Sequence, residues 1–374
     1  MKIGILTQPL QTNYGGLLQA YALQATLKAM GHEVLLINRY YNGISALRWT
    51  LGRMKKAIQL FIKVLSHNLS FNEAMIAFHA NNHRTFSFTK KYINPNSGFL
   101  TSDVTLTKFC AKQSFDAYVV GSDQVWRPEY APNIYNYFLD FVDDCAVKRL
   151  AYAASFGTEN WLFTSEQTYR CKSLLKKFEY ISTREESGVE LCSKYLGRDD
   201  AQWVLDPTLL LKASDYREIV TDAHLPQIDG NIVVSYLLDE NELKHNLLNK
   251  VCKSMNASQY NAKKGFPKKW KSQASVEEWL YGFSKAKYAV IDSFHGCVFS
   301  ILFHVPFIVV GNKKRGMARF TSLLSIFGLE NRLVDENFSG DVESLPEIDW
   351  TQVDQFLEVK KKESLIFLKQ IESK

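Results

Sequence analysis

Short apolar runs alternate with amphipathic stretches from the start of the chain. Lys2–Thr7 is short and apolar, which predicts a buried strand, and the segment LLQAYALQATLKAM after it has apolar residues at helical spacing. Gly31 ends that helix, and Glu33–Asn38 is a second apolar run. A strand, a helix and a strand in this order predict two neighbouring parallel strands joined by a right-handed crossover.

The same alternation continues over most of the chain and predicts an α/β fold with two Rossmann-like domains, at residues 1–205 and 206–345. The further predicted strands are Ala117–Asp123, Arg149–Gly157, Tyr180–Thr183, Gln202–Leu205, Asn231–Leu238, Gln259–Ala262, Tyr288–Asp292 and Pro306–Gly311. The predicted helices between them are Glu166–Phe178, Glu240–Met255, Val276–Lys285 and Gly296–Phe303.

Two segments depart from this alternation. Residues 45–88 are expected to form a helical insertion in the first domain, and its stretch near 47–65 has one apolar face with interspersed Lys and Arg. Such a face is typical of a helix that packs on the protein or covers a cleft, or of one that lies on an anionic membrane surface. Residues 346–374 predict a second amphipathic helix, long enough to pack back on the first domain.

Composition and charge exclude several classes of protein. The 374 residues are 46% hydrophobic and 22% charged, which excludes a disordered chain, and the net charge of +6 is too small to favour nucleic-acid binding. Between Lys253 and Phe320, twelve Lys and Arg face three acidic residues, so this stretch carries +9 and the rest −3. A ligand bound there is expected to be anionic.

The termini and the cysteines predict a cytoplasmic protein. The six Cys include no CxxC pair, so neither a disulfide framework nor a metal site is predicted. The first residues lack the apolar run and cleavage site of a signal peptide, and no apolar run approaches the ~20 residues that span a bilayer. Peripheral contact with the inner face of the membrane stays open because of the basic segment near 47–65.

Candidate chemistry lies where predicted strands end, because ligands of open parallel sheets bind beyond the carboxyl ends of strands. In the second domain, Ser293, His295 and Gly296 follow a strand and begin a helix, where unpaired N–H groups favour an anion and an imidazole can transfer a proton. Arg315 and Arg319 follow the next strand, and their guanidinium groups suit a phosphate or carboxylate. A buried histidine bound to a carbonyl and a solvated charge run are the alternatives.

The first domain contributes three further strand-end loops. In the first loop, Gly15 and Gly16 follow Asn13 and allow backbone N–H groups to approach a ligand, although no nucleotide-binding motif is present. The third begins with Arg184, aimed at an anion or paired with a neighbouring Glu. The second combines groups that suit a sugar, or that form a capped turn: Asp123, Gln124, Trp126 and Arg127.

Together these pieces resemble the polysaccharide pyruvyl transferase family. The matching segments occur in the family's order over most of the chain, although residues 45–88 and the C-terminal helix add little. They are GILTQPLQTNYGGLLQAYALQ, VVGSDQVWRP, YAASFG, ISTREESGVEL, VLDPTLLL, DSFHGCVFSILFHVPFIVV and RGMARFTSLL. The resemblance implies a GT-B-like fold with the site in the cleft, the first domain on the acceptor side and the second on the donor side.

The resemblance also implies an activity. A pyruvyl transferase moves pyruvate from phosphoenolpyruvate onto a sugar of a cell-surface polysaccharide, or of a lipid-linked precursor, as a ketal across two hydroxyls. This places the protein in exopolysaccharide biosynthesis at the cell envelope. No cofactor is implied, and a divalent ion held by the donor's phosphate is left open.

By resemblance, His295 matches the active-site histidine and Arg184 matches an arginine that binds the donor. Ser293 stands where better-characterised members carry an arginine, so Arg315 or Arg319 is expected to replace that cation. From its residue type and strand-end position, Asp123 is expected to deprotonate or orient the acceptor hydroxyl. On the same grounds Trp126 is expected to stack on the sugar. A glycosyltransferase that uses a nucleotide sugar and a non-catalytic glycan- or anion-binding relative remain the alternative functions.

Overall fold

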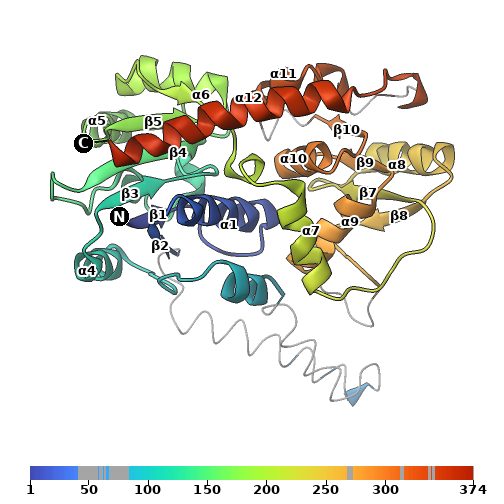
Figure 1. Ribbon diagram of the computed structural model, residues 1–374, viewed down its shortest axis with the longest axis horizontal. Coiled ribbons are helices and arrows are strands. Elements are labelled where there is room, and N and C mark those ends of the chain that lie inside the picture. Colours follow the sequence, from blue (N-terminus) through green and yellow to red (C-terminus); the bar gives the residue numbers. More distant parts are fainter. Residues whose placement is uncertain are drawn as a thin grey trace.

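Two parallel β-sheets form the centres of two α/β domains (Figure 1). The computed structural model describes residues 1–40, 58, 62, 65–66, 84–267, 273–311, 316–335, 338 and 342–373. All the pairings recorded between strands are parallel, as the alternating pattern predicts. The predicted α/β fold class is confirmed.

Within the described ranges, the first sheet has six strands and the second has five. The order of the first is β2 (Glu33–Ile37), β1 (Lys2–Leu6), β3 (Ala117–Val120), β4 (Lys148–Ala154), β5 (Tyr180–Thr183) and β6 (Gln202–Trp203). The order of the second is β11 (Leu333–Val334), β10 (Phe307–Val310), β9 (Tyr288–Ile291), β7 (Ile232–Tyr236) and β8 (Ser258–Asn261). Each predicted strand is present, and the short β11 at an edge of the second sheet was not predicted.

The α-helices lie between these strands and on the faces of the two sheets (Figure 1). In the first domain they are α1 (Tyr14–Ala29), α4 (Asp103–Gln113), α5 (Ser165–Leu175) and α6 (Glu186–Leu191). The second domain contains α7 (Ala213–Asp222), α8 (Glu242–Ser254), α9 (Val276–Lys285), α10 (Phe294–Leu302) and α11 (Ala318–Phe327). α4 was not predicted from the sequence. Its only buried side chains are Leu106 and Cys110, so its apolar periodicity is weak.

Helix α1 packs against the apolar interiors of both domains. Leu23 and Leu27 pack with β1 and β3 in the first domain. Tyr14, at the other end of the helix, stacks on Trp279 of α9 with ring centroids 5.8 Å apart, and its hydroxyl donates to the carbonyl of Ala274 at 2.8 Å. These contacts place the start of α1 between the domains.

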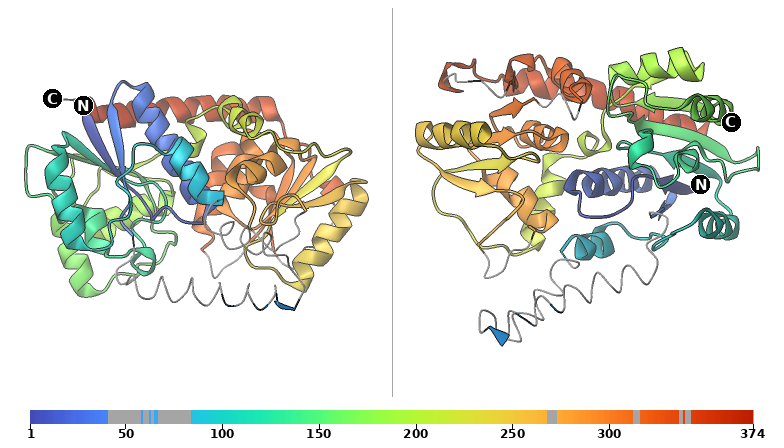
Figure 2. Two further views of the ribbon diagram at one scale, coloured as in Figure 1. Left: turned by 90° about the horizontal axis from the view of Figure 1, so that it is seen from below. Right: turned by 180° about the vertical axis from the view of Figure 1, so that it is seen from behind.

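The last long helix, α12 (Trp350–Lys369), connects the domains a second time. In Figures 1 and 2 it spans both of them. Val353 near its start joins the apolar cluster of the second domain, whereas Phe367 and Leu368 near its end pack in the first. Ser364 Oγ also accepts from the backbone N–H of Leu205 at 2.9 Å.

Most of the predicted insertion lies outside the described residues. Residues 84–92 are helical, and Ile58, Ile62 and Leu65 are helical and exposed, whereas the rest of the segment up to residue 83, including the basic positions near 47–65, is not described apart from Ser66. Among the described residues, no helix is both long and apolar enough to cross a membrane.

Candidate active site in the interdomain cleft

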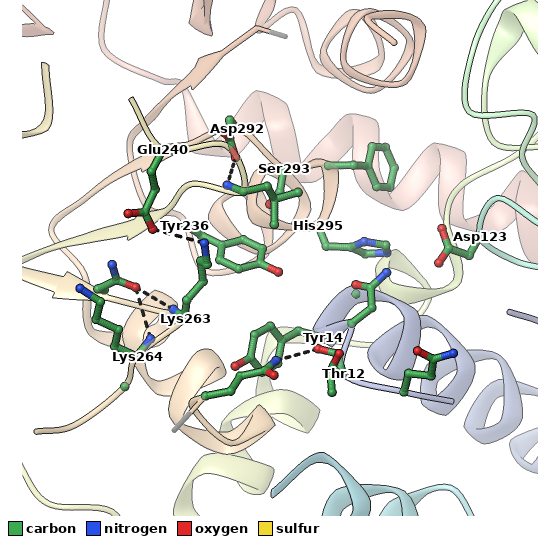
Figure 3. Close-up of a pocket in the computed structure, with 18 of the residues that line it drawn as sticks. Thr12, Tyr14, Asp123, Tyr236, Glu240, Lys263, Lys264, Asp292, Ser293 and His295 are labelled. Carbon is green, nitrogen blue, oxygen red and sulfur yellow. Dashed lines mark hydrogen bonds and ion pairs between the residues drawn. The ribbon is translucent and has the colours of Figure 1, made fainter. Parts of the chain in front are cut away.

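A pocket of about 1440 Å³ opens between the two domains (Figure 3). The first domain contributes the loop after β1, the start of α1 and the loop after β3, and the second contributes the ends of β7, β8 and β9 with the start of α10. Most of the strand-end residues predicted from sequence do line it: Asn13, Gly15, Asp123, Gln124, Ser293, His295 and Arg319. The carboxyl ends of strands from both sheets therefore meet at one pocket.

His295 lies in the first turn of α10 and is only 8% exposed. The helix begins there because Ser293 caps it: the Ser293 Oγ accepts from the N–H of Gly296 at 3.0 Å. The imidazole packs against α1, since a Cβ at Gly15 would lie 1.9 Å from His295 Nδ1. The other ring nitrogen, Nε2, is buried and makes no hydrogen bond among the described residues. Nδ1, beside Gly15, is therefore the ring nitrogen that a ligand can reach.

Asp206 faces the buried nitrogen of His295, with its Oδ2 3.7 Å from Nε2. Thr208 donates to its Oδ1 from the backbone N–H at 3.0 Å and from Oγ1 at 2.6 Å. Ser122 Oγ, which donates to the carbonyl of Ala153 at 2.8 Å, lies 3.3 Å from the Asp206 Oδ2. Although burial raises the pKa of Asp206, the interactions with His295, Arg184 and Thr208 outweigh it and hold the pKa well below its usual value. Asp206 is therefore a fixed carboxylate behind the imidazole.

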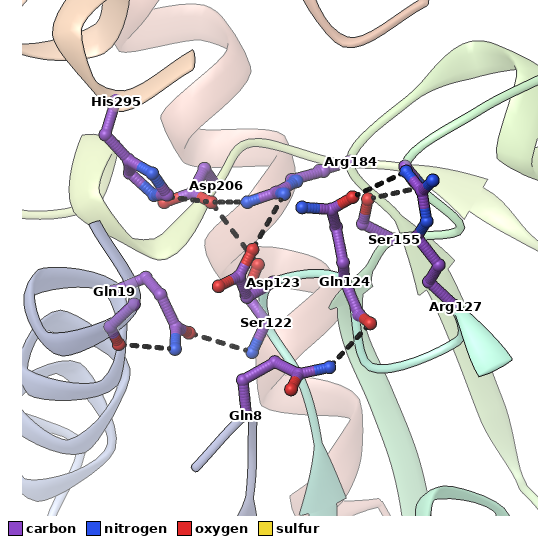
Figure 4. A network of polar contacts seen from close by, with 12 residues as sticks. Gln8, Gln19, Ser122, Asp123, Gln124, Arg127, Ser155, Arg184, Asp206 and His295 are labelled. Atoms are coloured by element: carbon purple, nitrogen blue, oxygen red, sulfur yellow. Dashed lines mark hydrogen bonds and ion pairs between the residues drawn. The ribbon is translucent and has the colours of Figure 1, made fainter. Parts of the chain in front are cut away.

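Arg184 lies beneath the pocket rather than in it, with no exposed side-chain surface. Burial opposes its charge, but the three carboxylates around it raise the pKa of the guanidinium above its usual value. Its NH1 lies 2.8 Å from Asp206 and its NH2 3.0 Å from Asp123 (Figure 4). Its Nε lies 3.3 Å from Glu185. Direct contact with the donor, which the resemblance implies, is not what this geometry shows. The alternative given by the sequence, an ion pair with a neighbouring Glu, is confirmed for Glu185.

Asp123 is placed by an unusual turn after β3. Gly121 has φ +119, and a Cβ there would lie 2.2 Å from the carbonyl oxygen of Tyr152, so only glycine fits. Asp123 itself has φ +70. Its Oδ1 accepts from Arg184, and its Oδ2 would lie 3.5 Å from a Cβ at Gly16. Gly16 does not line the pocket, and a side chain there would make only ordinary contact with this carboxylate.

Two residues predicted to bind the acceptor do not reach the pocket. The Trp126 side chain is fully buried, stacks on Phe138 at 5.3 Å and donates from Nε1 to the carbonyl of Tyr137. The prediction that it stacks on a sugar is therefore wrong. Arg127 pairs with Glu129 at 3.0 Å and does not line the pocket. Gln124 does line it, and its backbone carbonyl accepts from Gln8.

Of the two arginines that the sequence predicts at the second-domain side of the site, the structure describes Arg319. Arg319 lines the pocket from the first turn of α11. Burial and the nearby charge of Arg184 lower its pKa to about 10, against the opposing charges of Glu185 and Asp123. Arg315 lies outside the described residues.

A family model for polysaccharide pyruvyl transferases matches residues 13–314, a range that holds both sides of this pocket. The chain belongs to the polysaccharide pyruvyl transferase family. Arg184 and His295, which the resemblance singled out, both lie within the matched range, and so do Asp123 and Asp206. No curated protein matches this family member.

The fold of this pyruvyl transferase family member was compared with those of solved structures. UDP-GlcNAc 2-epimerase from Neisseria meningitidis, bound to UDP-GlcNAc, is 10% identical, with a TM-score of 0.53 over 97% of this chain and 94% of that chain. The SsfS6 glycosyltransferase of Streptomyces sp. SF2575 is also 10% identical, with a TM-score of 0.43 over 100% of both chains. The epimerase match agrees with the two parallel sheets and shows a GT-B-like fold. At this identity it shows nothing about the ligand.

The structure also adds residues that the sequence did not single out. The second-domain part of the pocket is lined by Gln259, Asn261, Lys263, Lys264 and Gln273, among others. Asp206 is another such residue, although it follows β6 at the same sheet edge as Arg184, which was a usable signal. Within the described ranges, no cluster of three or more His, Cys, Asp or Glu side chains is arranged to hold a metal ion.

Proposed function

We propose that the chain transfers pyruvate from phosphoenolpyruvate to two hydroxyls of a sugar, forming a ketal. The observation that carries this proposal is His295 at the wall of a large interdomain pocket, with one ring nitrogen against a buried carboxylate and the other toward the pocket, in a member of the pyruvyl transferase family. An imidazole held in this way is suited to proton transfer near neutral pH.

The donor is proposed to bind where two helix N-termini and one guanidinium group reach the pocket. The helices α1 and α10 both begin there, so the unpaired N–H groups of their first turns favour an anion. Asn13 and Gly15 belong to one helix start and Ser293 to the other, whereas Gly296 does not line the pocket and its N–H donates to Ser293. Arg319 adds a guanidinium suited to the carboxylate or phosphate of the donor.

The first addition is assigned to His295 and Asp123. His295 gives a proton from Nδ1 to the methylene carbon of the donor, while Asp123 accepts the proton of the attacking hydroxyl. A carbon–oxygen bond forms at the central carbon. The second hydroxyl then attacks the same carbon and the bond to phosphate breaks. One of the two hydroxyl protons replaces the proton given by His295 and the other leaves with phosphate, so water is neither consumed nor released.

The acceptor is proposed to occupy the part of the pocket farther into the second domain. Gln259, Asn261 and Gln273 offer amides to sugar hydroxyls, and Tyr236 and Phe266 offer aromatic surface. Lys263 and Lys264 stand on the same wall, where Lys263 pairs with Glu240 at 3.2 Å. The two lysines suit a saccharide that carries negative charge, and Glu240 on the same wall offsets part of their charge. We propose a precursor of a cell-surface polysaccharide, free or lipid-linked, modified at the cytoplasmic side.

Mass spectrometry tests the activity. Candidate acceptors incubated with protein and phosphoenolpyruvate should gain the mass of pyruvate less one water, with one phosphate released per ketal. Parallel reactions with nucleotide sugars test the glycosyltransferase alternative, in which the acceptor gains a sugar instead. Ligand binding without turnover of any donor would contradict the proposal and favour a non-catalytic relative.

A further inference from the structure

The Arg184 guanidinium is surrounded by carboxylates from three parts of the chain. Asp123 follows β3, Glu185 precedes α6 and Asp206 follows β6, and all three lie within 3.3 Å of a guanidinium nitrogen. The side chain has no exposed surface and its carbon Cζ lies 4.5 Å from the ring centroid of Phe294, the residue before His295. Phosphoenolpyruvate, itself an anion, would meet these carboxylates before the guanidinium.

Asp206 joins this cluster to His295 of the second domain. Its Oδ2 accepts from Arg184 at 2.8 Å and lies 3.7 Å from His295 Nε2, while Thr208 donates twice to its Oδ1. Figure 4 shows the connected line from His295 through Asp206 and Arg184 to Asp123. A carboxylate held by so many donors has little freedom to move.

The two ring nitrogens of His295 therefore have different environments. Nε2 is buried and faces Asp206, whereas Nδ1 lies beside the backbone of Gly15 at the pocket. A carboxylate on one nitrogen fixes the ring orientation and directs the proton that is exchanged to the other nitrogen. The distance of 3.7 Å can shorten when a ligand closes the site, as catalytic contacts often do.

We propose that Arg184 and Asp206 are positioning residues. Arg184 holds the carboxylates of Asp123 and Asp206 in place. Asp206 orients the imidazole of His295 so that Nδ1 is the atom that exchanges the proton. Neither residue touches the donor. This assignment rests on the proposed function for its kinetic consequences. It differs from the donor-binding role that the resemblance implies for Arg184.

Kinetics and binding distinguish the two roles. Asp206→Asn and Arg184→Lys should each lower kcat about 100-fold, the scale of a catalytic group misplaced by ~1 Å, while the KM and the calorimetric Kd for phosphoenolpyruvate change less than about threefold. Arg39→Lys is the matched control, because Arg39 is equally buried and paired with Asp103 at 2.8 Å but lies outside the pocket. It should leave kcat and Kd unchanged. A tenfold weaker Kd with kcat retained in Arg184→Lys would assign this residue to the donor instead and overturn the proposal.

A second measurement does not depend on turnover. The ¹⁵N resonances of the His295 imidazole, assigned by their loss in His295→Gln, should change in Asp206→Asn and stay in place in Arg39→Lys. Unchanged resonances in the folded Asp206→Asn protein would overturn the positioning role even if the protein transfers pyruvate. If the wild-type protein neither binds phosphoenolpyruvate nor forms a ketal, the proposed function fails, while the resonances still decide whether Asp206 orients the ring.

Discussion

The imidazole of His295 lies directly against the backbone of Gly15, although the two residues belong to different domains. A Cβ at Gly15 would lie 1.9 Å from His295 Nδ1 and 2.3 Å from Cγ, distances at which a neighbouring atom must move. Helix α1 carries Gly15 and α10 carries His295, so this contact sets the closest approach of two helix starts at the pocket.

Gly15→Ala should abolish pyruvyl transfer with little loss of secondary structure. The added methyl group would take the space beside Nδ1, so the ring must turn away or lose its access to the donor. Gly16→Ala is the informative comparison, because its Cβ would make only ordinary contacts at 3.5 Å. Steady-state kinetics should show a much smaller loss for Gly16→Ala, and equal losses would contradict the role given to the contact.

His295→Gln should reduce kcat by about 10²- to 10⁴-fold, as expected when a general acid is removed. Because the glutamine amide cannot transfer a proton but partly fills the same space, circular dichroism and phosphoenolpyruvate binding should remain close to those of the wild type. Near-normal turnover in the variant would remove His295 from the mechanism.

Ser293→Ala should lower the free energy of unfolding by about 1 kcal/mol, the usual cost of losing a helix cap. The same change disorders the start of α10 and should also weaken phosphoenolpyruvate binding. Ser275→Ala is a matched control: Ser275 caps α9 through a hydrogen bond to the N–H of Glu278 and does not line the pocket. Urea unfolding should show similar losses for both, and calorimetry a loss of binding only for Ser293→Ala.

Acid should selectively remove the stability that Asp206 contributes. Its pKa is lower in the folded than in the unfolded chain, so the ionised carboxylate stabilises the fold above its ordinary pKa of about 4, and this contribution is lost as the pH falls further. Asp206→Asn should therefore be less stable than the wild type by about 3 kcal/mol at neutral pH, since a buried pair is broken. Urea unfolding should show this difference shrinking below pH 4, and a constant difference would contradict the ionised state.

Lys263→Ala combined with Lys264→Ala should raise the KM for a phosphate- or carboxylate-bearing acceptor and leave the KM for phosphoenolpyruvate unchanged, because these lysines line the second-domain wall. A neutral acceptor should be affected little. Replacing Lys176 and Lys177, an exposed pair elsewhere on the first domain, provides the control. An equal rise for charged and neutral acceptors would argue against an anionic acceptor.

The sequence by itself determined the order of strands and helices along the chain and the loops that carry polar residues, because apolar periodicity is a local property. It therefore identified His295, Asp123 and the glycines of α1 as neighbours of a cleft. Only the tertiary structure decided which of these side chains face the pocket. Trp126 and Arg184 follow strands as Asp123 does, yet packing against Phe138 and pairing with three carboxylates bury them. Asp206 lies beside the imidazole of His295 because β6 ends opposite α10 of the other domain. No residue spacing along the chain encodes this relationship.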